Sequence, residues 1–113
     1  MAVVALNRRR DGKPGGTLRL LTTAAAGMSD AVQIFSLPSG KCITVTLMPS
    51  TSTAKVQFST SPDELVENDT ANWHDWAAGD VTATTTSAFA SQVTALRSVV
   101  VSGTADIIME VVV

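Results

Sequence analysis

VTALRSVVVSGTADIIMEVVV, residues 93–113, is the stretch of sequence that decides the fold. Two runs rich in β-branched Val and Ile, which favour strands, flank Ser102-Gly103, a pair typical of a hairpin turn. Val99–Val101 and Val111–Val113 would be apolar on both faces of a strand, as in central strands or strands packed against another subunit. The stretch therefore predicts two central strands joined as a hairpin.

Alternation of apolar and polar side chains predicts further strands upstream. Residues 41–48 and 54–59 alternate most regularly, and we expect 41–59 to form a second hairpin. The other expected strands are 17–22, 31–37 and 81–86. About seven strands at such spacing favour an all-β fold, an antiparallel β-sandwich or jelly-roll-like barrel, with an extended N-terminal arm.

One short helix is expected after residue 60. Ser61 has the side chain of an N-cap, Pro62 suits the first helical position, and Glu64 completes a capping box. The polar residues Asn68-Asp69-Thr70 follow at once, so the helix should have about two turns.

The composition fits a single β-rich domain. The chain has 113 residues, with 15 Thr and 14 Val against only 14 Leu, Glu and Lys together, and only 16% of residues are charged. About 25% is typical, so charge-driven disorder and a long coiled coil are excluded. A surface rich in Ser and Thr is common where neighbours in an assembly cover a protein. An ordinary soluble β-domain remains the alternative.

Few residues could carry chemistry. The chain has one His, His74, and one Cys, Cys42, which excludes an intrachain disulfide and a His/Cys zinc site within one chain. Enzymatic activity is therefore not expected, and neither is a cofactor. A cluster of acids could form a calcium site, although its spacing does not match a calcium loop. Its members are Asp63, Glu64, Glu67, Asp69, Asp75 and Asp80.

The charge is distributed unevenly along the chain. Residues 1–20 carry five basic residues and one acid, whereas residues 21–113 carry three basic residues and nine acids. We therefore divide the chain into a basic N-terminal arm, residues 1–16, and a β-sandwich domain, residues 17–113. No apolar run approaches the ~20 residues of a membrane helix.

The basic residues of the arm are the first candidates for partner binding. They are Arg8, Arg9, Arg10 and Lys13. An acidic protein surface is a better partner for them than nucleic acid, because the rest of the chain is acidic and lacks interleaved aromatic and basic residues.

Two tryptophans and one arginine are further candidates for interactions. Trp73 and Trp76 could stack on sugar rings, anchor an interface or close the core, and we expect Trp73 in the core and Trp76 at a partner. Arg97, in an otherwise apolar strand, needs a carboxylate partner. Candidates for that partner are Asp75, Asp80 and Glu110.

The second half of the chain, residues 55–113, carries a distinctive series of motifs. They are Val56-Gln57-Phe58-Ser59, Ser61-Pro62, Trp73-x-x-Trp76-x-x-Gly79-x-Val81, Val93–Arg97 and Ser102-Gly103-Thr104. In these motifs the chain resembles small virion proteins of tailed bacteriophages, most of all capsid decoration (cement) proteins. The resemblance implies a β-sandwich-like subunit, often trimeric, that binds the capsid exterior.

The function expected from the sequence is therefore structural. We expect a non-enzymatic protein that binds the major capsid protein and neighbouring copies of itself, and stabilises the virion after assembly in the host cytoplasm. The alternative is a carbohydrate-binding or host-adhesion module of a tail or head fibre, which would use Trp73 and Trp76. A small nucleic-acid-binding accessory protein ranks third.

Overall fold

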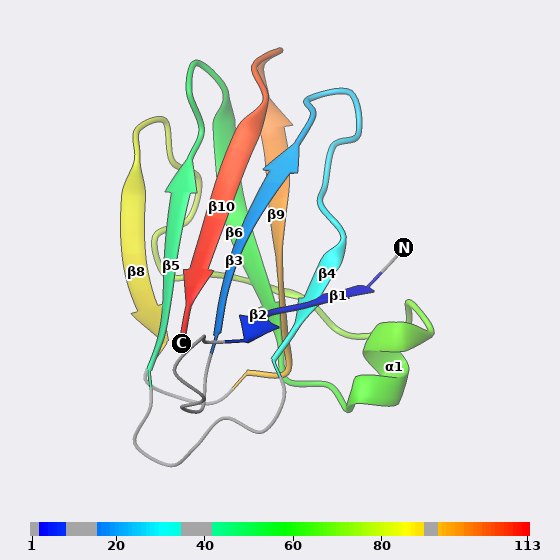
Figure 1. Cartoon of the computed structure of the whole chain (residues 1–113). Coiled ribbons are helices and arrows are strands. Elements are labelled where there is room, and N and C mark those ends of the chain that lie inside the picture. The colour runs from blue at the N-terminus through cyan, green and yellow to red at the C-terminus, as the bar shows by residue number, and fades with distance from the viewer. Residues whose placement is uncertain (1–2, 9–15, 35–41, 90–92) are drawn as a thin grey trace.

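The protein is a sandwich of two five-stranded sheets (Figure 1). The computed structural model describes residues 3–8, 16–34, 42–89 and 93–113. Sheet A runs in the order β1 (Val3–Ala5), β4 (Ala31–Gln33), β9 (Ala95–Ser102), β6 (Thr53–Ser59) and β7 (His74–Asp75). Sheet B runs β2 (Asn7–Arg8), β3 (Gly16–Thr22), β10 (Ile107–Val112), β5 (Ile43–Met48) and β8 (Thr85–Phe89).

The expected fold class is confirmed. All strand pairs are antiparallel except β1 with β4, and the described residues contain one short helix, α1 (Asp63–Glu67). The sheets do not close into a barrel. The strand expected at 81–86 begins later, at Thr85, while Val81 forms an isolated bridge with Ala54. The strand expected at 31–37 has its described part at Ala31–Gln33.

The two C-terminal strands are central, but the predicted hairpin is wrong. β9 is the middle strand of sheet A and β10 is the middle strand of sheet B. The tight turn at Ser102-Gly103 thus carries the chain from one layer to the other. Both strands have an apolar row, and stacking them across the sandwich buries the two rows against each other.

The hairpin predicted over 41–59 is wrong for the same reason, because β5 lies in sheet B and β6 in sheet A. The two crossings lie side by side. The Ser52 hydroxyl donates to the Ala105 carbonyl at 2.8 Å and accepts from the Ala105 N–H at 2.9 Å. Gly103 has a φ of +103°, and a Cβ there would lie 2.8 Å from Ser52 Cα, so glycine is required.

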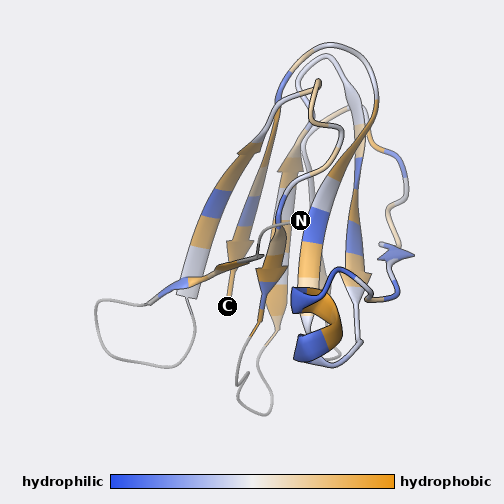
Figure 2. Ribbon diagram, turned by 90° about the vertical axis from the view of Figure 1, so that its right-hand side faces the viewer, coloured by the Kyte–Doolittle hydropathy of each residue, from blue (hydrophilic) through white to orange (hydrophobic). Residues whose placement is uncertain are grey.

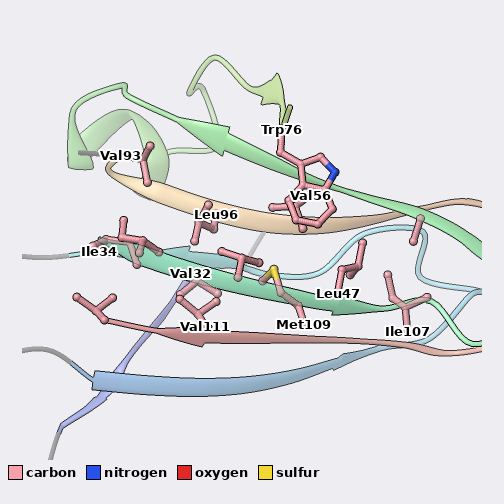
Figure 3. Close-up of a cluster of buried hydrophobic side chains, with 14 residues drawn as sticks. Val32, Ile34, Leu47, Val56, Trp76, Val93, Leu96, Ile107, Met109 and Val111 are labelled. Atoms are coloured by element: carbon pink, nitrogen blue, oxygen red, sulfur yellow. The ribbon is translucent and has the colours of Figure 1, made fainter. Parts of the chain in front are cut away.

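The core lies between the sheets and draws on both (Figure 3). Alternate residues of β5, β10 and β6 point inward, as the alternation predicted. The fully buried members with the largest side chains are Ile43, Leu47, Leu96, Ile107 and Met109. A smaller cluster forms outside sheet A, where Val66 of α1 packs on Ala31 and Ala95.

The predicted capping box is wrong. No side chain caps α1, which is flanked by Pro62 and spans five residues instead of two turns. Ser61 is engaged elsewhere: its hydroxyl accepts from the Asn72 N–H at 3.1 Å, and its carbonyl accepts from Thr94 Oγ1 at 2.6 Å. Ser61 therefore ties the helical segment to the start of β9.

Part of the N-terminal arm belongs to the sheets. β1 pairs in parallel with β4 of sheet A, and β2 pairs with β3 of sheet B. Val4 and Leu6 pack against the core. Gly16 lies so close to the Asn7 backbone that a Cβ would collide with it. Residues 3–8 thus bridge the two layers, so deleting residues 1–16 would remove two strands together with the basic charges.

Candidate interaction surface

One face of the sandwich exposes apolar and hydroxyl side chains. It consists of the outward residues of β3, β10, β5 and β8, which we call the open face. Its members are Thr17, Arg19, Leu21, Thr44, Thr46, Met48, Thr86, Ala88, Ile108, Glu110 and Val112. Leu21 is 59% exposed and Val112 is 49% exposed, although both lie on inner strands of the sheet. In profile, no described helix lies on this side (Figure 2).

The strand register gives the open face three rows. Leu21, Ile108 and Met48 are neighbours in an apolar row. The next row runs Arg19, Glu110, Thr46 and Thr86, with a hydrogen bond of 2.9 Å between the two Thr hydroxyls. The last row runs Thr17, Val112, Thr44 and Ala88. Arg19 and Glu110, opposite each other, are the charged residues of the open face.

The basic cluster of the arm adjoins the same sheet. Arg8 belongs to β2, the edge strand next to β3, and its backbone pairs with Gly16. Arg9, Arg10 and Lys13 lie outside the described residues. The chain enters this segment from β2 and leaves it at Gly16 of β3, so both of its ends belong to sheet B.

The two tryptophans lie in different places from those expected, because Trp76 and not Trp73 is in the main core. Trp76 is 2% exposed and reaches into the main core near Val56 (Figure 3), and its Nε1 donates to the Gly79 carbonyl at 2.7 Å. The chain itself covers this ring, so the structure gives no support to the assignment of Trp76 to partner binding. Trp73 is half-buried outside sheet A.

The outer side of sheet A carries a polar network centred on Arg97. Its Nε donates to Gln57 Oε1 at 2.8 Å, and its guanidinium lies 4.3 Å from the centroid of the Trp73 ring. Gln57 Nε2 donates to Asp75 Oδ1 at 3.0 Å, and Lys55 Nζ lies 3.0 Å from that oxygen. Asp75 therefore reaches Arg97 through Gln57.

Two pKa shifts follow from this network. The hydrogen bonds from Gln57 and Lys55 lower the pKa of Asp75. Burial lowers the pKa of Arg97, and the negative charge of Asp69 opposes that shift. Asp69 is thus the acid whose charge acts on Arg97, which corrects the expected choice among Asp75, Asp80 and Glu110.

The remaining candidates do not assemble a reactive site. His74 is exposed, as expected, with its ring 5.6 Å from that of Phe58. Within the described part of the chain, no three His, Cys, Asp or Glu side chains group together as a metal site would require. The six acids that could have formed a calcium site therefore include no group of three close enough to share a metal ion.

The open face could not be located from the sequence before the strand order was known. The alternation in 17–22 and 107–112 marks Leu21 and Val112 as outward, yet their exposure depends on which strands lie beside them and on what covers the sheet. The one signal was compositional: Thr in place of charge on the outward positions of β5 and β8.

Comparison with protein-family models, with curated proteins and with solved structures gave no match. Among the described residues, no helix is long and apolar enough to cross a membrane.

Proposed function

We propose that the protein is a non-enzymatic structural protein of a tailed-bacteriophage virion, which binds the capsid exterior as a decoration protein and stabilises it. The resemblance of residues 55–113 motivates this class. The observation that carries the proposal is the open face, on which Leu21 and Val112 are 59% and 49% exposed although both belong to inner strands of the sheet. Exposed apolar side chains of this kind are typical of an interaction surface.

Docking would use two features of sheet B together. The apolar row of the open face would be buried against the capsid protein, which is the main favourable term in most association. Arg19 and Glu110 would fix the orientation, since misplaced charges in an interface are costly. The basic residues that follow β2 would bind acidic capsid surface next to it, with strong dependence on salt.

The glycan-binding alternative has lost its support. A sugar platform needs an accessible aromatic face, but Trp76 is buried and the Trp73 ring is covered by Arg97. No observation favours that function over docking on protein.

The test uses capsid shells from a phage deleted for this chain. The wild-type protein is expected to sediment with these shells and to raise their melting temperature. The variant L21K/V112K should bind at least about a hundredfold more weakly, because two charges would be desolvated in the interface. Its fold should persist, since both residues are exposed in the free protein.

The matched control is L65K/V101K, which places the same substitutions on the other side of the molecule, where Leu65 is 38% and Val101 is 44% exposed. It should bind as the wild type does. Equal binding by both variants would refute the open face as the docking surface. Failure of the wild-type protein to bind the shells would refute the proposed function itself.

A further inference from the structure

β8 is an open edge of sheet B. Thr85–Phe89 pairs with β5 on one side, and it is the last strand of its sheet. No described residue hydrogen-bonds to the backbone on its other side. In Figure 1, β8 lies at the outer border of the molecule, on the opposite side from α1. Its free N–H and C=O groups form a template for another strand.

The other three sheet edges are shorter or more protected. β1 has three residues, and β2 and β7 have two each, with Arg8 in β2 and His74-Asp75 forming β7. β8 has five residues and, over residues 81–89, the chain contains no charge, Pro or Gly. Edge strands in natural proteins are usually protected from pairing by Lys, Pro or a bulge. β8 contains neither Lys nor Pro.

We propose that β8 pairs in antiparallel fashion with β8 of a second copy, around a two-fold axis at Ser87. We assign the free edge of β8 to a second copy of the same strand. Two antiparallel β8 strands can exchange backbone N–H and C=O groups, and because β8 has no charged residue, no like charges would face each other. Centring the axis on Ser87, the middle residue, pairs all five residues. Thr86 then lies opposite the partner's Ala88, on the exposed side of the sheet.

The pairing joins two B sheets into one continuous sheet. The open faces of both copies then lie on the same side, because β8 contributes Thr86 and Ala88 to that face. The β2 strands lie at the two far edges, beyond β3. Phe89 anchors the edge strand by packing edge-on against Phe58 of sheet A, at 5.4 Å between ring centroids. This inference does not depend on capsid binding, although two linked faces would increase avidity.

Charge substitutions at the edge test the pairing. The wild-type chain, of 11.8 kDa, should form particles of twice that mass, measured by light scattering over a dilution series. T86K/A88K places like charges opposite each other twice, and so does T86E/A88E. Each variant should raise the dimer dissociation constant at least about tenfold. An equimolar mixture of the two should restore a dimer, because opposite charges then meet.

The matched control is T44K/T46K, in the same rows one strand further in, which should stay dimeric. Thermal melting checks that all variants fold. A wild-type monomer at every concentration overturns the pairing, and so does a dimer or trimer indifferent to the edge charges.

Discussion

The outer sides of the two sheets differ although their inner sides are alike. Outside sheet A, α1 and the segment after it cover Ala31 and Ala95 with Val66, Ala71 and Trp73. Beside this cover, Lys55, Asp75, Gln57 and Arg97 join in hydrogen bonds and an ion pair. Outside sheet B, the described chain provides no comparable cover, and Leu21 and Val112 remain 59% and 49% exposed.

The difference shows how each face is adapted to its surroundings. Charged groups that are satisfied by neighbours on the same face make sheet A compatible with water without any partner. Apart from Arg19 and Glu110, sheet B has Thr, Ala and aliphatic side chains on its outward positions. The aliphatic groups would gain by being covered, and the Thr hydroxyls would need hydrogen-bond partners in a cover. The described chain therefore covers the outer side of sheet A more fully than that of sheet B, although Leu65 and Val101 remain exposed on the sheet A side.

The largest expected effect comes from a charge placed under the cover of sheet A. Val66 is fully buried, so Val66→Asp should lower the free energy of unfolding by about 3–5 kcal/mol, the usual effect of an unpaired buried charge. Urea denaturation followed by tryptophan fluorescence measures this change.

The matched variant Val112→Asp places the same residue on the open face. Val112 is 49% exposed. The substitution should lower the free energy of unfolding by only about 1 kcal/mol, because Asp has a poor strand propensity. Similar losses in the two variants would contradict the assignment of a covered and an uncovered side.

A smaller effect is expected from the polar network. Arg97→Ala removes the contact with the Trp73 ring and the hydrogen bond to Gln57, and should cost about 1–2 kcal/mol. The unfolding free energy of Arg97→Lys should lie between those of the wild type and Arg97→Ala, because an ammonium lacks the planar group that stacks on the Trp73 ring. Arg19→Ala on the open face should change stability by no more than about 0.5 kcal/mol. Equal effects at Arg97 and Arg19 would show that the network adds no stability.

Local pattern predicted the strands of this fold and failed at their partners. The alternation in residues 43–48 and 53–59 sets which side chains are buried, and the structure agrees. The tight connections at 49–52 and 103–106 indicated hairpins, yet each joins the two layers. A short turn requires only that two strands be close. Whether they pair or stack depends on burying both apolar rows at once, which no local signal contains.

The same limit applied to single residues. Trp76 is buried because its backbone N–H bonds to Val56 O, which places its ring over the core, whereas Trp73 faces outward toward Arg97. Trp73 and Trp76 are only three residues apart in a polar segment, and the local sequence did not indicate which of the two rings would point into the core. Ser61 had the sequence of a helix cap, but a long-range bond from Asn72 uses its hydroxyl. Where a tertiary contact competes with a local one, sequence pattern alone does not decide between them.

The smallest expected effect is the contribution of Asp75, on the outer side of sheet A, to the stability of the protein in acid. Because hydrogen bonds hold the pKa of Asp75 below its ordinary value of 3.8, the unfolded chain takes up this proton more readily than the folded protein. The ionised carboxylate thus contributes stability above pH 3.8, and that contribution is lost as the pH falls through the folded pKa. Asp75→Asn should therefore lower the melting temperature slightly at neutral pH and reduce the loss on acidification, measured from about pH 5 to about pH 2. Gln57→Ala, which removes the largest cause of the shift, should reduce the same acid loss. Parallel melting curves for wild type and Asp75→Asn across this range would contradict a stabilising role for the network on the outer side of sheet A.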